Sequence, residues 1–219
     1  MKKSFLFVLI FAVIIVFGFT AYNKLNPVNK ADAESIKQVA LKDFKEKTQK
    51  INNKKATYII EINGTKYTNK EFEKFKARRD LAQIEDNKPA LSEKQAKHEF
   101  IKRKALLDEA KKNKLYTTKE EASEYANHVR EILENSTKPS DQQVREEIKN
   151  FREALGLTED QYWNDYAIPM YQEDLTIVKL KKSFFNSMKW KHQPYNTVLK
   201  EWENYTEKKA TTASVKELQ

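Results

Sequence analysis

The sequence predicts a mainly α-helical protein with one small β-hairpin in its N-terminal third. Glycine is scarce, with 3 residues in 219, whereas Lys and Glu, which favour helices, are abundant. Five segments repeat one helix-start pattern, in which Ser or Thr is followed three residues later by Glu or Gln and then by an apolar stripe. Hydrophobic residues make up 39% of the chain and include 3 Trp, 10 Tyr and 12 Phe, which supply a core and argue against disorder.

The N-terminus predicts export. Lys2 and Lys3 precede an uncharged apolar run from Phe5 to Ala21. This run is longer than a usual signal core of about 7–15 residues and close to the roughly 17–25 residues that cross a bilayer. Residues 1–21 are therefore either a retained single-pass anchor or a signal peptide cleaved near Ala31-Asp32-Ala33. Under both interpretations the lysines stay cytoplasmic and everything after about residue 24 is exported, either held at the cell membrane or secreted.

The exported part starts with two short regions. Residues 22–34 are polar with one proline and are expected to be a linker. Residues 35–57 are expected to form an amphipathic helix or stalk with Ile36, Ala40, Phe44 and Ile51 on a narrow apolar stripe. Because the segment lacks Trp and has interleaved acidic residues, a helix laid on the main domain is favoured over a membrane-surface helix. The chain has no cysteine, so neither a disulfide nor a cysteine-linked lipid is available.

The hairpin is predicted from residues 58–67. Tyr58 to Ile62 alternate in a β-branched strand pattern, and Asn63-Gly64 tolerates the positive φ angles of a type I′ turn. After a short return strand, Thr68-x-x-Glu71 forms a capping box that starts the next helix.

Further helices are predicted along the rest of the chain. The same start pattern recurs at Ser92, Thr118, Ser140 and Thr158, at irregular spacings that exclude a solenoid of fixed period. Gly156 is expected to cap one helix in a left-handed conformation. Ile168-Pro169 is expected to interrupt the pattern before a long helix from Met170 to about Lys189. After Pro194 a last helix, 195–206, precedes a loosely ended polar tail, 207–219.

Three stretches carry a family resemblance: EINGTKYTNKEF, FIKRKALLDEAKKNKLYTTKEEASEY and LGLTEDQYWNDYAIPMYQEDLTIVKLKKSF. In this order, from about Tyr58 to Phe185, they resemble the N-terminal chaperone domain of SurA-type and PrsA-type extracytoplasmic folding factors. The matching positions are Asn63-Gly64, Thr68, Glu71, Phe72, Leu106-Leu107, Glu109-Ala110, Leu155-Gly156-Leu157-Thr158 and Trp163. The resemblance implies a SurA-like helical domain over residues 58–206 that binds unfolded polypeptides.

One departure from the family is informative. Family members usually carry a parvulin-type prolyl isomerase domain after the long helix, whereas here only Trp190 to Pro194 separate that helix from the last one. The resemblance therefore implies a chaperone-like module without its catalytic insert. Prolyl isomerase activity is suggested only by the name of the family and by no segment of this sequence.

The residues themselves predict no enzyme, metal or cofactor. His98, His128 and His192 are isolated, no ligand cluster has metal spacing, and three glycines cannot build a phosphate loop. The net charge of +9 does not indicate nucleic acid, because the N-terminus predicts export and lysines alternate with glutamates along most of the predicted helices. An anionic membrane or cell-wall polymer is a further expected partner.

An aromatic and Met-rich set is the candidate peptide-binding surface, because such side chains pack adaptably against many sequences. The same helical spacing is also typical of a core. The candidates are Tyr162, Trp163, Tyr166, Met170, Tyr171, Phe184, Phe185, Met188, Trp190 and Trp202.

Two functions remain open on this basis. One is an ATP-independent holdase for unfolded or extended polypeptides. The other is a non-catalytic scaffold that binds one specific membrane or cell-wall partner. A holdase is expected to suppress aggregation of unrelated clients, whereas a dedicated scaffold is not.

Overall fold

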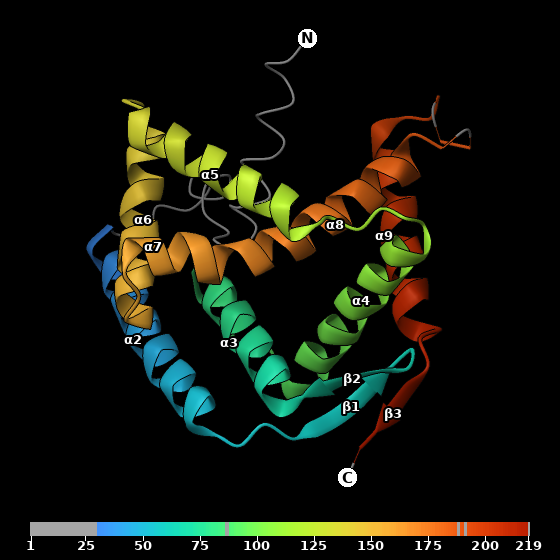
Figure 1. Ribbon diagram of the computed structural model, residues 1–219, viewed down its shortest axis with the longest axis horizontal. Helices are drawn as coiled ribbons and strands as arrows, with labels where there is room; N and C mark the ends of the chain where they lie inside the picture. The colour runs from blue at the N-terminus through green and yellow to red at the C-terminus, as the bar shows by residue number, and fades with distance from the viewer. Residues whose placement is uncertain (1–29, 86–87, 188, 191, 219) are drawn as a thin grey trace.

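The computed structural model describes residues 30–85, 88–187, 189–190 and 192–218, which form a mainly helical fold with a small antiparallel sheet (Figure 1). Its elements are α2 (Lys30–Asn53), β1 (Tyr58–Ile62), β2 (Thr65–Thr68), α3 (Asn69–Glu85), α4 (Glu93–Lys112), α5 (Lys119–Asn135), α6 (Pro139–Leu155), α7 (Glu159–Gln161), η1 (Tyr162–Ala167), α8 (Ile168–Phe185), α9 (Tyr195–Thr211) and β3 (Val215–Glu217). The predicted anchor or signal, 1–21, lies outside the described residues. Within the described part, no helix is long and apolar enough to cross a membrane.

The predicted hairpin is confirmed. Asn63 and Gly64 have φ angles of 50° and 85°, both positive, as a type I′ turn requires. Ile60 and Ile62 point into the core at 2% exposure each, while a register irregularity between residues 58 and 60 leaves Tyr58 exposed. Thr68 and Glu71 form the expected capping interactions, with the Glu71 carboxylate accepting the Thr68 N–H at 2.7 Å.

The expectation of a loosely ended tail from residue 207 is wrong. Helix α9 continues to Thr211, and β3 then pairs antiparallel with β1, so the sheet order is β2-β1-β3. The Asn63 N–H donates to the Ser214 carbonyl at 2.8 Å, and the Ser214 N–H donates to the Asn63 side-chain oxygen at 3.0 Å. Lys97 of α4 also forms an ion pair with Glu217. The reason is that β1 has a free edge beside the end of α9, and backbone pairing there needs no apolar side chain in β3.

Four of the five helix starts predicted from a Ser or Thr followed by Glu or Gln agree with the structure. Ser92, Thr118 and Thr158 each form a capping box, and Gly156 is left-handed with φ of 71°. Ser140, however, lies inside α6, which starts at Pro139 with no side-chain cap. Proline is well suited to the first helical turn, where its missing N–H is not needed.

The helix break expected at Ile168-Pro169 is also wrong. Residues 159–185 run as one continuous helical rod through α7, the wide-turned η1 and α8, with Pro169 in the first turn of α8. A π-type turn leaves the carbonyls near the proline ring outside the ordinary α-helical pattern, which relieves the clash that a proline causes in an α-helix. The rod ends at Phe185, four residues earlier than expected.

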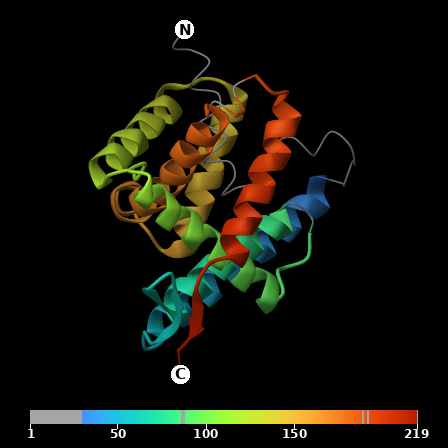
Figure 2. The same cartoon turned by 90° about the vertical axis from the view of Figure 1, so that its right-hand side faces the viewer.

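Helix α8 crosses the middle of the molecule, with α5 and α6 on one side and α2, α3 and α4 on the other (Figure 1). Helix α9 packs along α4, as Figure 2 shows, and leads down to β3 at the C-terminus. The largest core cluster joins α2, α3, α5, α6, η1 and α8, a second lies between the sheet, α3 and α4, and a third lies between α4, α8 and α9.

Helix α2 belongs to this domain. It starts at Lys30, so residues 30–34 are helical and not linker, as the helix-favouring Ala31, Ala33 and Glu34 permit. Leu41, Phe44 and Ile51 are buried in the largest cluster, and Phe44 stacks on Phe151 of α6 at 5.2 Å between ring centroids. The prediction of a helix laid on the main domain is confirmed.

Candidate functional site

The structure places nine of the ten candidate peptide-binding residues, in the core, along two hollows and at one end of the molecule. Tyr162, Trp163 and Tyr171 are buried in the largest cluster at 4–6% exposure, and Trp202 is buried in the third cluster at 7%. Burial raises the pKa of Tyr171 well above its usual value. Tyr162, Tyr171 and Trp202 are sealed in the core and cannot reach a peptide, whereas Trp163 also lines a hollow between α5, α6 and η1.

The other candidates keep some exposure. Tyr166 and Met170 are half-buried on the α3-facing side of the rod, where they line two hollows. Phe184 and Phe185 are half-buried at the C-terminal end of α8, packed against the third cluster. Trp190, in the connection after α8, is half-buried and stacks on Phe184. Met188 lies outside the described residues.

A partly buried ion-pair network fixes α8 against α4. The guanidinium of Arg103 donates to Glu173 at 2.8 Å and to Asp174 at 2.6 Å, and Lys104 donates to Glu173 at 2.6 Å. Burial alone would raise the pKa of Glu173, but Arg103 and Lys104 outweigh it and lower that pKa to about 2. Burial would likewise lower the pKa of Arg103, and the two carboxylates raise it instead. Glu173 and Arg103 are therefore both charged throughout the neutral range.

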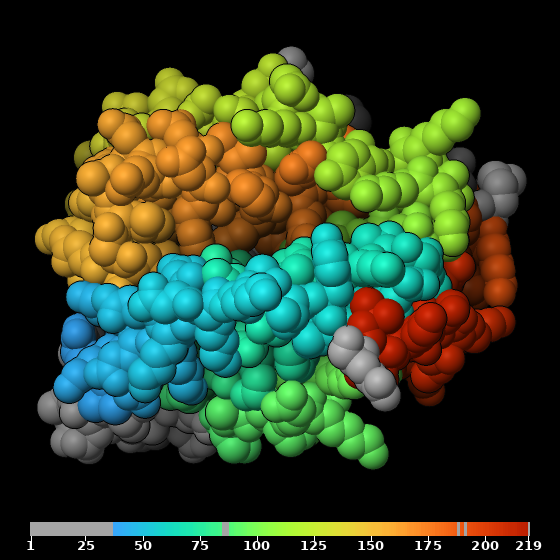
Figure 3. Space-filling model, turned by 60° about the horizontal axis from the view of Figure 1, so that its bottom comes forward, coloured from blue at the N-terminus to red at the C-terminus, as the bar shows by residue number. Residues whose placement is uncertain are grey.

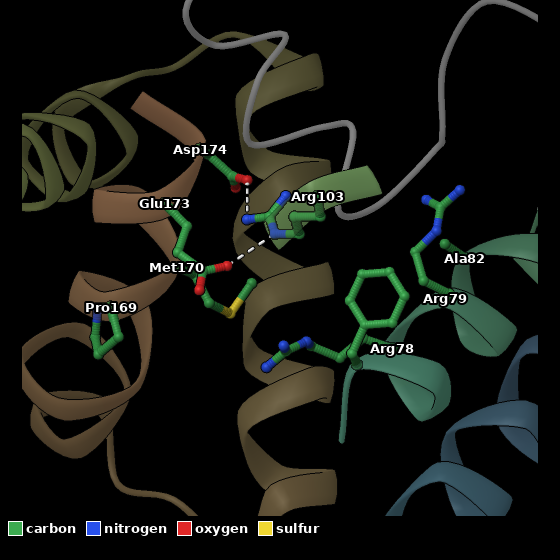
Figure 4. Close-up of a pocket in the computed structure, with 9 residues that line it drawn as sticks. Arg78, Arg79, Ala82, Arg103, Pro169, Met170, Glu173 and Asp174 are labelled. Carbon is green, nitrogen blue, oxygen red and sulfur yellow. Dashed lines mark hydrogen bonds and ion pairs between the residues drawn. The ribbon is translucent and has the colours of Figure 1, made fainter. Parts of the chain in front are cut away.

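The first hollow lies beside this network, between α3, α4 and α8 (Figure 4). Its volume is about 180 Å³. Phe75 and Ala82 of α3 and Met170 of α8 supply apolar lining, while arginines and the acidic pair supply polar lining. An engineered apolar cavity of about 150 Å³ holds a benzene ring, so this hollow has room for one large apolar side chain. The complete lining is Phe75, Arg78, Arg79, Ala82, Arg103, Pro169, Met170, Glu173 and Asp174.

The second hollow, of about 120 Å³, lies between α2, α3 and η1. Phe44 and Thr48 of α2 and Tyr166 of η1 line it, and Arg78 lines both hollows. In Figure 3 a furrow separates the orange surface of η1 and α8 from the blue-to-teal surface of α2 and α3. We call the two hollows joined at Arg78 the rod furrow. Burial raises the pKa of Tyr166, although Arg78 beside it opposes the shift.

Cationic side chains outnumber carboxylates in the rod furrow. Its lining carries four cations, Lys74, Arg78, Arg79 and Arg103, and two carboxylates, Glu173 and Asp174. Arg79 donates to Glu99, outside the furrow, at 2.6 Å, and Arg103 is held by the two lining carboxylates. Positive charge therefore flanks the apolar surface, which suits apolar side chains carried on a polar backbone.

A third hollow of about 170 Å³ lies elsewhere, between α5, α6 and η1. Its rim is crossed by ion pairs of Arg130 with Glu134 and Glu159 and of Arg152 with Glu159. It shares no lining residue with the rod furrow, so it cannot extend the same binding surface.

No catalytic or metal constellation is found in the described part of the chain. His98 pairs with Glu207 at 2.8 Å, while His128 and His192 are exposed and apart. No group of three or more His, Asp or Glu side chains there is placed to hold a metal ion.

The sequence reasoning missed the residues of α3 and α2 that complete the rod furrow. Arg78 and Arg79 form the only adjacent arginine pair in a chain that otherwise prefers lysine. Because arginine suits partly buried hydrogen bonding better than lysine, this pair was the signal that could have found the furrow.

No protein-family model matches the chain, and no curated protein or solved structure does so either. We therefore infer its function from its own residues and their geometry.

Proposed function

We propose that this chain is an exported, ATP-independent chaperone-like protein that holds extended segments of unfolded polypeptides in the rod furrow. In this proposal it belongs with the SurA-type and PrsA-type folding factors that its sequence resembles, is tethered by or released from residues 1–21, and has no isomerase activity. Binding is reversible and consists of burying the client's apolar side chains.

The observation that carries the proposal is the pair of neighbouring hollows. In an extended peptide, successive side chains point to opposite sides, so alternate side chains of one segment can enter one surface. Two hollows that share Arg78 offer places for two such side chains. Their volumes of about 180 and 120 Å³ suit large and medium side chains without demanding one residue type.

The adaptable lining also supports a promiscuous site. Met170 is unbranched and polarizable, and the arginine stems beside it are long, so the walls can adjust to different occupants. The connection between α8 and α9 supports the absence of a catalytic insert, since only residues 186–194 lie between the two helices.

The test is suppression of aggregation of two unrelated clients diluted from denaturant. We expect the protein to suppress both, and Met170→Glu and Thr48→Trp to weaken suppression. The first variant places a carboxylate where the client's apolar side chain would pack in one hollow, and the second fills the other hollow. A penalty of ~1.4 kcal/mol for packing an apolar client side chain against this carboxylate lowers client affinity about tenfold.

The matched control is Val39→Glu. Val39 is on α2, 59% exposed, and lines neither hollow, so the variant adds the same charge without touching the furrow. Circular dichroism must show all three variants folded. If the wild type suppresses neither client at excess, the chaperone proposal fails and the dedicated single-partner scaffold remains.

A further inference from the structure

The end of the molecule where α8 passes into α9 carries a string of aromatic side chains. Phe184 lies at the centre, with ring centroids 5.8 Å from Trp190, 6.2 Å from Phe185 and 5.5 Å from Trp202. Phe185 contacts Tyr195 in turn at 5.8 Å. The inner end of the string, Trp202, is buried at 7% exposure, and the outer end, Tyr195, is 64% exposed. The string therefore runs from the core to the surface.

Lysines frame this string. The ammonium of Lys189 lies 4.3 Å from the ring centroid of Trp190, and that of Lys181 lies 5.6 Å from the ring of Phe185. Lys200 is exposed on the first turns of α9. Among the described residues, no carboxylate forms an ion pair with any of these three. The sequence between Asp174 and Glu201 contains no acidic residue, in contrast to the alternating charges of the other helices.

We propose that this end, defined by Lys181, Phe185, Lys189, Trp190, Tyr195 and Lys200, binds the headgroup region of an anionic phospholipid bilayer. Unpaired lysines are attracted to an anionic surface within a Debye length. Trp and Tyr are the side chains enriched at membrane interfaces, where an apolar ring and a polar edge are both accommodated.

The aromatic side chains favour lipid over a soluble anionic polymer. Binding of a soluble anionic polymer by charge attraction needs only the lysines. It does not explain why Tyr195 is 64% exposed beside half-buried Trp190 and Phe185. A bilayer interface binds both the lysines and the exposed aromatic rings favourably. The apolar sequence run Phe5 to Ala21 also brings the chain to a bilayer if it is retained as an anchor. The inference is independent of peptide binding in the rod furrow, because the two surfaces share no residue.

The experiment uses the full-length chain reconstituted into two sets of vesicles, one of phosphatidylcholine and one rich in phosphatidylglycerol. Both carry a quencher attached to lipid at shallow depth. The Trp190 signal is the difference between the wild type and Trp190→Phe, since Trp163 and Trp202 are buried. At low salt we expect at least twofold stronger quenching of Trp190 in the anionic vesicles, lost in 0.5 M salt.

A charge-reversal pair gives the matched control. Lys189→Glu with Lys200→Glu is expected to abolish the extra quenching. Lys42→Glu with Lys45→Glu makes the same change in net charge on exposed positions of α2 and is expected to retain it.

Two results would overturn the inference. One is equal quenching of Trp190 in both vesicles. The other is a change in Trp190 emission caused by a soluble glycerol-phosphate polymer together with no quenching by anionic lipid, which would identify a wall polymer as the partner.

Discussion

Replacing Glu173 by Gln tests whether the ion-pair network between α4 and α8 stabilises the fold. The variant keeps the shape of the side chain and removes the negative charge that pairs with Arg103 and Lys104. Arg103 retains Asp174 at 2.6 Å, whereas Lys104 loses the one carboxylate that it pairs with in the described part of the chain and keeps its contacts with the Tyr67 and Phe100 rings. The expected result at pH 7 is a folded but less stable protein.

The magnitude follows from the pKa of Glu173. A drop from the ordinary value of 4.5 to about 2 sets a ceiling of ~3 kcal/mol, at ~1.36 kcal/mol for each pKa unit. One third of the side chain is in contact with solvent, which screens the interaction. The expected loss in the free energy of unfolding is therefore ~1–2 kcal/mol.

The loss depends on pH in a defined window. Because the pKa of Glu173 is lower in the folded than in the unfolded chain, its ionised form stabilises the fold fully above about pH 4.5. That contribution disappears as the pH falls from 4.5 towards 2. The wild type and Glu173→Gln are therefore expected to converge in stability over this range.

Urea unfolding followed by circular dichroism, at several pH values from 7 down to the lowest at which the wild type is still folded, measures both effects. Glu203→Gln makes the same chemical change at an exposed position without an ion pair in the described part, and it is expected to alter stability by less than ~0.5 kcal/mol. Equal stability of wild type and Glu173→Gln at pH 7, or a gap that stays constant on acidification, would refute the reasoning.

Three further predictions concern the core, a helix cap and the C-terminal strand. Trp163→Ala is expected to lower the free energy of unfolding by ~3–5 kcal/mol in urea titrations, since the side chain is 4% exposed, and a loss below ~1 kcal/mol would contradict its place in the core. Gly156→Ala is expected to cost ~1–2 kcal/mol, seen as a lower melting temperature, because φ is 71° and the added Cβ would meet no atom within 4 Å, so only the backbone is strained. Deleting residues 212–219 removes β3 and is expected to weaken hydrogen-exchange protection of the β1 amides, and unchanged protection would show that the pairing does not form.

Local chemistry made much of the fold predictable. The Asn63-Gly64 turn and the caps at Thr68, Ser92, Thr118 and Thr158 depend on residues within three positions of each other, so the sequence alone specifies them. The failure at Ser140 has the same origin, because Pro139 offered a competing local start that the hydroxyl pattern ignored.

Features that depend on residues distant in the sequence were harder to predict from the sequence. The pairing of β3 with β1 depends on where α9 ends in space. The sequence of Val215–Glu217 has no apolar pattern that would predict a strand. The candidate site was also hard to predict, because it too depends on contacts between distant segments. Helical spacing left open whether Trp163, Tyr171 and Met170 belong to the core or to a peptide-binding surface. The rod of η1 and α8 has neighbours on several sides, and spacing does not separate a sealed interface from an open hollow.

The central claim is that clients occupy the rod furrow, and site-specific photo-crosslinking tests it most directly. A photoreactive residue is placed at Met170, which lines the first hollow, and in a second protein at Val39, which is exposed and lines neither hollow. Both proteins are mixed with unfolded client and irradiated. Crosslinks from position 170 that exceed those from position 39 and fade when an excess of unlabelled unfolded client is added are the predicted result. Equal or absent crosslinking at position 170, with aggregation still suppressed, would contradict the account.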